Sequence, residues 1–241
     1  MHIHDLVITA PADSPNTDGI DPDSSRNVLI ERCTISCGDD HIAIKSGLDA
    51  AGRAVGIPST NITVRNNVHF AGRGISVGSE VSGGVQDVLI EGVQHLGPSE
   101  HGLHIKTSPS RGGYIRNVKY SNISVGDIVG DKVISLTTSY GSSSSSSSSS
   151  SSHGGGGSDG GASDVADPPL TDIENIQYTN IIRKGAIIAS KGAGSFSCFK
   201  QAPCKAVTLQ SVVLDPATGW ECENVKGGTA HHVSPSMGGC F

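Results

Sequence analysis

The chain has 241 residues and a formal net charge of −6, and only 17% of its residues are charged. General nucleic-acid binding needs a dense positive surface, so this composition excludes that class, and the low charge content also excludes a coiled coil or a basic tail. Glycine is enriched at 32 residues while the apolar runs stay short, which is typical of many short strands joined by turns. The sequence has no run of 18 apolar residues, so no transmembrane helix is expected.

The chain begins without the features of a secretory signal. Residues 1–5 contain neither a basic region nor an apolar region, and residues 6–8 already have the character of a strand. We therefore interpret residues 1–241 as a single domain that is incomplete at its N-terminus.

A short pattern recurs along the chain: a polar residue, often asparagine, precedes an apolar residue, any residue and a second apolar residue. The first apolar positions are Val28, Ile62, Val88, Val118 and Ile176, with a weaker copy at Val207. Most copies are followed by a second short strand, at residues 42–44, 75–77, 103–105, 133–136 and 186–188. This recurrence, mostly at 26–34 residues and without a helical period, predicts an all-β fold, a parallel β-helix.

In a β-helix each coil stacks on the next, so residues one period apart in the sequence become neighbours in space. We expect the five strong apolar positions to form one interior row. We also expect the asparagines that precede them to form side-chain hydrogen bonds at the coil corners; these are Asn27, Asn61, Asn117 and Asn175.

A low-complexity segment interrupts the repeat. Residues 142–152 are all serine, and a histidine and four glycines follow them. Such a sequence cannot bury enough apolar surface to offset the entropy lost on ordering. We predict that residues 141–167 are a disordered loop inserted into one coil; a linker between domains is the alternative.

Four of the six cysteines lie near the C-terminus, where the strand pattern is absent. We expect a disulfide between Cys222 and Cys240, and next between Cys198 and Cys204. The cysteine spacings do not match a zinc site, so neither a metal nor a cofactor is predicted. His41, His69 and His101 are interpreted as packed or surface histidines rather than ligands.

Four segments combine acids, bases and glycines beside strand ends. In chain order they are NTDGID at 16–21, GDD at 38–40, GRGISVGSE at 72–80 and HIKT at 104–107. Their spacing approximates one coil each, so a β-helix would align them along one face. Paired carboxylates in a cleft are what glycosidic cleavage requires, because one protonates the leaving oxygen and another activates water. Cations beside them suit an anionic sugar.

These four motifs, in this order and spacing, resemble the signature of glycoside hydrolase family 28, the polygalacturonases. The resemblance runs from about Asp5 to Tyr140. It implies a right-handed parallel β-helix, inverting hydrolysis of α-1,4-galacturonan, and a substrate that is an anionic pectic polysaccharide. It also implies an extracellular or cell-wall location. We expect a monomer that binds neither nucleic acid nor membranes.

The resemblance assigns roles residue by residue. Asp39 would be the general acid, and Asp18 and Asp40 would hold and activate the water. Lys106 would bind a galacturonate carboxylate, so its removal would mainly raise KM. Tyr140 would contact the substrate.

The chain departs from the family pattern at two positions. The family histidine between two glycines is Arg73 here, and the family arginine of the last motif is His104. A permanent cation beside the acid would favour its ionised form. Alternatively the two residues exchange roles, so that Arg73 binds the carboxylate and His104 tunes the acid.

Each motif also has a structural interpretation. Asn, Asp and Gly are frequent turn residues, and the glycines at 72 and 74 are typical of a tight turn. Lys45 is interpreted as structural. Two functional alternatives remain open: hydrolysis of rhamnogalacturonan or xylogalacturonan, and a β-helix that binds pectin without cleaving it.

Overall fold

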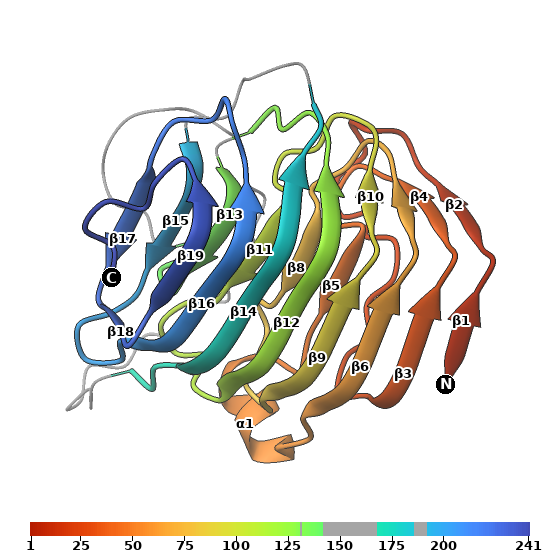
Figure 1. Ribbon diagram of the computed structural model, residues 1–241. Coiled ribbons are helices and arrows are strands. Elements are labelled where there is room, and N and C mark those ends of the chain that lie inside the picture. The colour runs from red at the N-terminus through yellow and green to blue at the C-terminus, as the bar shows by residue number, and fades with distance from the viewer. Residues whose placement is uncertain (131, 142–167, 186–191) are drawn as a thin grey trace.

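The computed structural model describes residues 1–130, 132–141, 168–185 and 192–241. The described strands pair in parallel and wind into stacked coils (Figure 1). The chain is therefore an all-β, right-handed parallel β-helix, as the sequence predicts.

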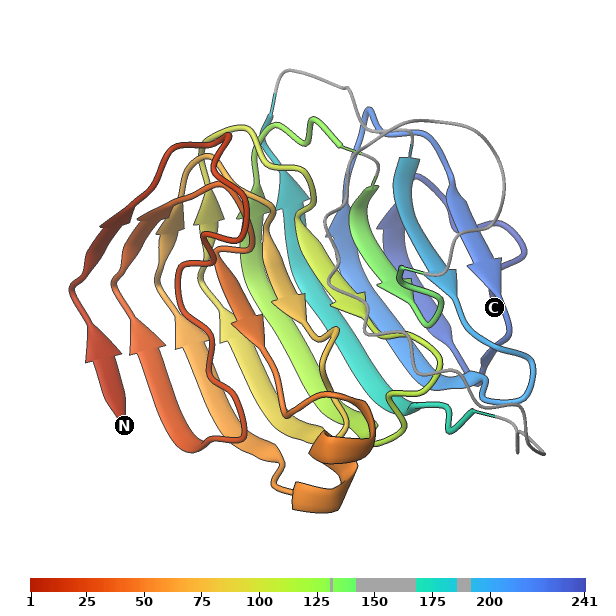
Figure 2. The same ribbon diagram turned by 180° about the vertical axis from the view of Figure 1, so that it is seen from behind.

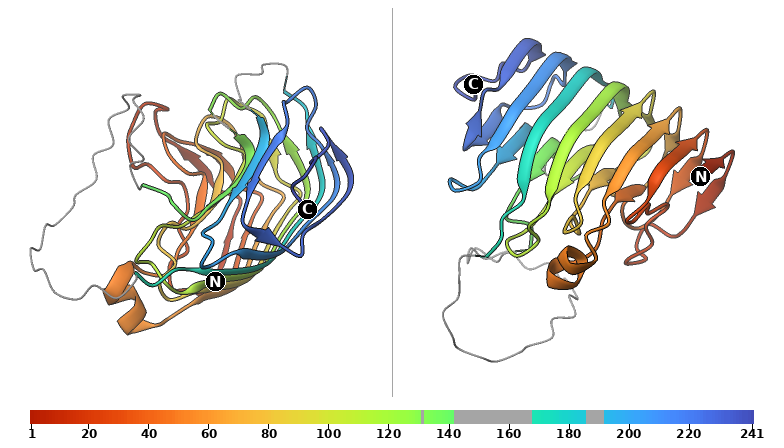
Figure 3. Two further views of the ribbon diagram at one scale, coloured as in Figure 1. Left: turned by 90° about the vertical axis from the view of Figure 1, so that its left-hand side faces the viewer. Right: turned by 90° about the horizontal axis from the view of Figure 1, so that it is seen from below.

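The larger sheet contains two rows of strands. The first row is β1 (His2–His4), β3 (Arg26–Glu31), β6 (Ser59–Arg65), β9 (Val85–Glu91), β12 (Tyr114–Val125), β14 (Asp172–Arg183) and β16 (Cys204–Val213), with β18 (Val225–Lys226) and β19 (Thr229–Ser234) against β16. The second row is β2 (Val7–Thr9), β4 (Thr34–Ser36), β7 (Val68–His69) and β10 (Gln94–His95), which joins the first at β12. Viewed from below, successive coils follow one another from the N-terminus to the C-terminus (Figure 3).

The smaller sheet faces the other side of the coils (Figure 2). It contains β5 (Ile42–Ile44), β8 (Ile75–Val77), β11 (Leu103–Lys106), β13 (Lys132–Thr137), β15 (Gly192–Ser197) and β17 (Trp220–Glu223), in this order. A short helix, α1 (Asp49–Val55), projects between β5 and β6, and its last turn is closed by Gly56 in a left-handed conformation with φ of 60°. Helix α1 is not among the elements predicted above, because seven residues are too few for a clear helical period.

The predicted interior row is confirmed. Val28 pairs with Ile62, Ile62 with Val88, Val88 with Val118, and Val118 with Ile176, and all five side chains are buried. The row continues to Val207 on β16. Each apolar residue contacts its equivalents one coil above and below, so the repeat itself builds the core.

The corner asparagines form the predicted hydrogen-bond ladder. Asn61 donates to Asn27 Oδ1 at 2.7 Å, Asn117 donates to Asp87 Oδ1 at 2.9 Å, and Asn175 donates to Asn117 Oδ1 at 2.8 Å. All of these residues have φ between 53° and 56°. Asparagine and aspartate tolerate this left-handed conformation better than other side-chain-bearing residues do, which explains why the repeat begins with them.

Both predicted disulfides are confirmed, and the remaining cysteines are free. Cys198 is bonded to Cys204, and Cys222 is bonded to Cys240. Cys33 and Cys37 are buried in the core as thiols. Of the predicted loop at 141–167, residues 142–167 lie outside the described residues, as does the predicted strand at 186–188. Within the part of the chain that the structure describes, no helix has the length and apolar character needed to cross a membrane.

Candidate active site

The first two sequence motifs are joined by a close backbone contact at Gly38. A Cβ atom on Gly38 would lie 2.0 Å from the carbonyl oxygen of Ser14, so only glycine fits there. The Thr17 hydroxyl accepts a hydrogen bond from the Gly38 amide at 2.9 Å and donates to the Ser14 carbonyl at 3.0 Å. The chain bends at Gly38 and Asp39 instead of continuing as a strand, which frees the two aspartates from strict strand alternation.

Backbone hydrogen bonds hold the motifs on consecutive coils. The Gly19 amide donates to the Asp40 carbonyl at 2.9 Å, and the Arg73 amide donates to the Asp39 carbonyl at 2.8 Å. Asp18, the Asp39–Asp40 pair and Arg73 therefore lie on three neighbouring coils. The structure brings together these predicted site residues, which are far apart in the sequence.

Asp40 and Lys106 form a buried ion pair. Lys106 Nζ lies 2.7 Å from Asp40 Oδ2, and 66 residues separate the two in the sequence. Burial raises the pKa of Asp40, and the Lys106 ammonium opposes that shift. For Lys106, burial by itself lowers the pKa, but the carboxylate of Asp40 and the neighbouring Tyr140 outweigh it, so the net shift is upward.

Asp18 forms an ion pair with Lys45, which the sequence predicts to have only a structural role. Lys45 Nζ lies 3.1 Å from Asp18 Oδ2 and 2.7 Å from Asp21 Oδ2. Burial raises the pKa of Asp21 to about 6, and the Asp18 charge adds to the shift while Lys45 opposes it. Burial lowers the pKa of Lys45, but its two carboxylate partners raise it further than burial lowers it. Lys45 follows the NTDGID motif by about one coil, and this spacing could have indicated from the sequence that Lys45 lies beside Asp18.

Arg73 reaches the expected position beside Asp39. Its Nη1 lies 3.7 Å from Asp39 Oδ2, while its Nε lies 3.0 Å from Glu100 Oε2. Glu100 was not predicted, and it takes up much of the guanidinium charge. Asp39 itself keeps one carboxylate oxygen, Oδ1, as the acceptor of the Asp40 amide at 3.0 Å.

His104 lies two positions before Lys106 on β11, and Tyr140 lies beside both. The His104 ring is buried, 4.6 Å from the ring of His101 and 6.1 Å from that of Tyr140. Burial first, and then the neighbouring His101 and Lys106, hold the pKa of His104 well below its usual range, so the imidazole is neutral at pH 7. Lys106 Nζ lies 5.0 Å from the centroid of Tyr140, within cation–π distance.

Three histidines form a buried cluster beneath the site. The ring nitrogens of His41, His69 and His95 that could bind a metal lie within 4.8 Å of one another, although 28 and 26 residues separate them in sequence. Both nitrogens of His41 are already engaged, with the carbonyls of Phe70 and Ala71 and with the Gly74 amide. The rings of His41 and His69 stack at 4.4 Å. The ring of His95 meets the other two edge-on. His41 and His69, which the sequence interprets as packed or surface histidines, are thus buried together with His95, which the sequence did not single out.

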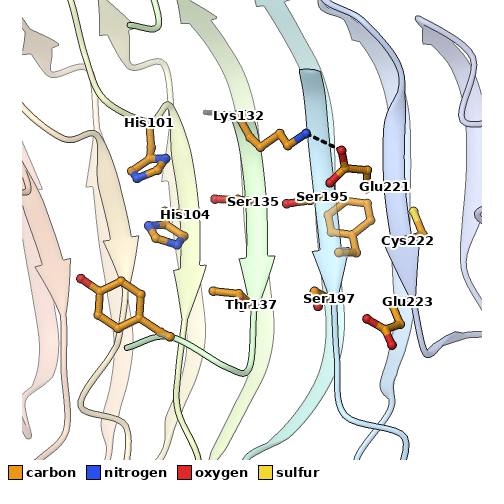
Figure 4. Close-up of a pocket in the computed structure, with 12 residues that line it drawn as sticks. His101, His104, Lys132, Ser135, Thr137, Ser195, Ser197, Glu221, Cys222 and Glu223 are labelled. Atoms are coloured by element: carbon orange, nitrogen blue, oxygen red, sulfur yellow. Dashed lines mark hydrogen bonds and ion pairs between the residues drawn. The ribbon is translucent and has the colours of Figure 1, made fainter. Parts of the chain in front are cut away.

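A hollow extends from His104 along the smaller sheet. It has a volume of about 620 Å³, and His101, Lys132, Ser135 and Glu223 are among the side chains that line it (Figure 4). Its floor is formed by β11, β13, β15 and β17. Of the predicted site residues, His104 and Tyr140 line this hollow, whereas the three aspartates, Arg73 and Lys106 do not.

Comparisons with known proteins agree with this arrangement. Residues 1–153 match the model of glycosyl hydrolases family 28. A probable polygalacturonase from Vitis vinifera is 32% identical over 229 residues, 93% of this chain and 42% of the relative. An endo-polygalacturonase from Pectobacterium carotovorum is 37% identical over 134 residues, 56% of this chain and 31% of the relative.

A solved structure shows the same fold. The exopolygalacturonase from Thermotoga maritima superposes with a TM-score of 0.75 at 27% identity, over 94% of this chain and 47% of that one. This chain thus spans less than half the length of these relatives. Because the family model matches more than half of this chain's residues, the chain belongs to glycosyl hydrolases family 28.

Proposed function

We propose that the protein hydrolyses α-1,4-galacturonosyl linkages of pectin, as a polygalacturonase. The observation that supports this most directly is the convergence of the four motifs. Asp18, Asp39 and Asp40 lie on adjoining coils, and Arg73 and Lys106 contact two of these aspartates. The relatives named polygalacturonase support the same reaction.

In the proposed mechanism Asp39 donates a proton to the glycosidic oxygen. Its side chain is the partly exposed member of the adjacent pair, at 13% against 3% for Asp40. Asp18 and Asp40 orient a water molecule that attacks the anomeric carbon from the opposite face, and one of them accepts the water proton. Lys45 contacts Asp18 and Lys106 contacts Asp40, so each of these two carboxylates has an ammonium partner.

Recognition of the anionic sugar is assigned to the cations and the aromatic side chain around this centre. Lys106 and Arg73 attract a galacturonate carboxylate, and Tyr140 offers an aromatic face beside Lys106. An inverting reaction requires the acid and base carboxyl groups to be about 6.5–9.5 Å apart, with room for the water between them. We propose that Asp39, as the acid, and Asp18 or Asp40, as the base, carry out such an inverting reaction.

The decisive experiment measures new reducing ends from polygalacturonate, with the anomeric form of the first product followed by NMR. Asp39→Asn should lower kcat at least about 100-fold, the lower end of what general acid catalysis contributes. Binding of the polymer without any release of reducing ends would instead support the pectin-binding alternative. Release from rhamnogalacturonan or xylogalacturonan alone would support those sister activities.

We also propose that the protein acts outside the cell as a monomer on the pectic polymer. The two disulfides support an oxidising compartment, because such bonds rarely persist in a reducing cytosol. Size-exclusion chromatography with light scattering tests the oligomeric state.

A further inference from the structure

The hollow changes in chemical character with distance from the catalytic aspartates. Two rows of side chains run along its floor from coil to coil (Figure 4). One row is His104, Ser135, Ser195 and Glu221, and the other is Thr137, Ser197 and Glu223. Lys106 is the register partner of Thr137 and lies beside the hollow without lining it. The floor therefore passes from a histidine, through four hydroxyl groups, to two carboxylates.

Among the residues that the structure describes, none that lines the far end of the hollow offers an unpaired cation to a carboxylate. Lys132 is the one lysine or arginine among the described residues that line it, and its ammonium is paired with Glu221 Oε1 at 2.9 Å. Glu223 is exposed and has no ion-pair partner within the described ranges. Lys200 lines the adjoining hollow, which shares Ser197 and Glu223 with this one.

A galacturonan bound along the smaller sheet would bring its sugar units past these coils in turn. Neighbouring coils are about 4.8 Å apart, so Glu223 lies about 14 Å along the sheet from Lys106. A free carboxylate on the sugar at that point would face the unpaired Glu223, and like charges at this range repel each other. Hydroxyl groups, in contrast, both donate to and accept from sugar hydroxyls.

We propose that this end of the hollow is a subsite for a sugar unit without a free carboxylate, and that Glu223 is the residue that rejects an ionised galacturonate there. The unit is either a methyl-esterified galacturonate or a neutral sugar. The inference rests on the proposed function, because it assumes a pectic polymer in this cleft. The catalytic end and the distal end would then select for different units of one chain.

The test compares kcat/KM on three polymers: de-esterified polygalacturonate, highly methyl-esterified polygalacturonate, and a backbone that alternates galacturonate with a neutral sugar. Glu223→Lys reverses the charge, and Glu223→Gln removes it with little change in shape. Glu174→Lys is the matched control, because Glu174 is an exposed acid on β14 in the other sheet.

We expect Glu223→Lys to raise kcat/KM on the de-esterified polymer about three- to tenfold, with Glu223→Gln intermediate. The value on the polymers with uncharged units should stay within about twofold. For the wild-type protein, a higher kcat/KM on the esterified polymer than on the alternating backbone assigns the unit to the methyl ester, and the reverse order assigns it to the neutral sugar. Equal effects of Glu223→Lys and Glu174→Lys on the de-esterified polymer would overturn the inference.

Failure of the proposed function gives a different result. If the wild-type protein releases no reducing ends from any of the three polymers, hydrolysis is refuted. Affinity electrophoresis on the same polymers then measures the subsite alone. The subsite is supported if the de-esterified polymer retains the Glu223→Lys variant more strongly than the Glu174→Lys variant. Equal retention of the two variants refutes it.

Discussion

At the scale of single residues, the carboxylates of the site differ in how their charge is balanced. Asp40 has one buried ammonium partner, Lys106, at 2.7 Å. Asp18 shares the ammonium of Lys45 with Asp21. Asp39 has the exposed guanidinium of Arg73 at 3.7 Å, which Glu100 also binds. Each lysine therefore balances the charge of a particular carboxylate of the site, in addition to any attraction of an anionic substrate.

The buried pair changes what is expected of Lys106→Ala. Sequence reasoning predicts mainly a rise in KM, but removal of Lys106 also leaves the buried Asp40 without its counter-charge. We expect kcat to fall as well, and the free energy of unfolding to fall by about 3 kcal/mol, because a buried charge that loses its partner is costly. Steady-state kinetics and urea unfolding measure both effects. The double variant Lys106→Met with Asp40→Asn should recover stability without activity; a rise in KM alone would favour the simpler view.

Lys45→Gln removes the ammonium between Asp18 and Asp21. The two carboxylates then face each other without a cation, and like charges resist joint ionisation, so one retains its proton to a higher pH. We expect kcat to fall about 10- to 100-fold, less than the roughly 100- to 10,000-fold that a proton-transfer group itself contributes, because Lys45 only supports Asp18. The acid limb of the pH–rate profile should move to higher pH. Lys45→Arg, which keeps the charge, should retain the wild-type profile. An unshifted profile in Lys45→Gln would return Lys45 to a structural role.

At the scale of elements, the corner ladder explains the strength of the repeat. Each strong copy places asparagine or aspartate at a left-handed corner, and hydrogen bonds join Asn27 to Asn61 and Asn117 to both Asp87 and Asn175. The weaker copy has Ala206 there, with φ of 52°, at the register position next to Asn175. Alanine gains no hydrogen bond at this corner and is strained in this conformation.

Ala206→Asn should therefore stabilise the protein. We expect a gain of about 0.5–1.5 kcal/mol in the free energy of unfolding, from relief of the left-handed strain and one added hydrogen bond to Asn175. Ala206→Gly isolates the first contribution, since glycine adopts the conformation but adds no bond. Urea unfolding of the three proteins gives both values, and a destabilised Ala206→Asn would contradict the ladder as the source of stability.

At the scale of the whole molecule, stacking brings titratable side chains into the dry core. Burial lowers the pKa of His95 to about 3 and that of His69 well below the usual value of 6.5. His41, stacked on His69, is shifted in the same direction by burial. These rings are neutral in the folded protein but take up protons in the unfolded chain as pH falls below 6.5.

Acid should consequently destabilise the fold. The unfolded state binds more protons below pH 6.5, so each such histidine costs about 1.4 kcal/mol of stability per pH unit until its folded-state pKa is reached. For His95 that window runs from pH 6.5 down to about 3. Urea unfolding at pH 7, 6 and 5 should show this slope, and His95→Leu should reduce it. The exposed His232→Gln is the control, and an equal slope in His95→Leu would show that other groups dominate acid unfolding.

The fold could be predicted from the sequence because the pattern that specifies each coil is short and recurs along the chain. A polar corner residue followed by alternate apolar positions fixes which side chains point inward, since neighbouring strand residues face opposite sides. The same argument places Val28, Ile62 and Val88 in one row. Cys222 and Cys240 could be paired from their place near the C-terminus, although the sequence did not show that Cys222 lies in β17 and that two further strands separate it from Cys240.

What only the tertiary structure decided is how side chains meet at the corners and between coils. The four motifs could be recognised in the sequence, but the partners of their aspartates come from residues 27 to 66 positions away, as with Lys45–Asp18 and Lys106–Asp40. At these bends the backbone leaves the strand geometry, so period alone does not tell where a long side chain points. Burial decides the rest: the charge state of a histidine or lysine depends on the coils that cover it, and no single segment of the sequence contains that information.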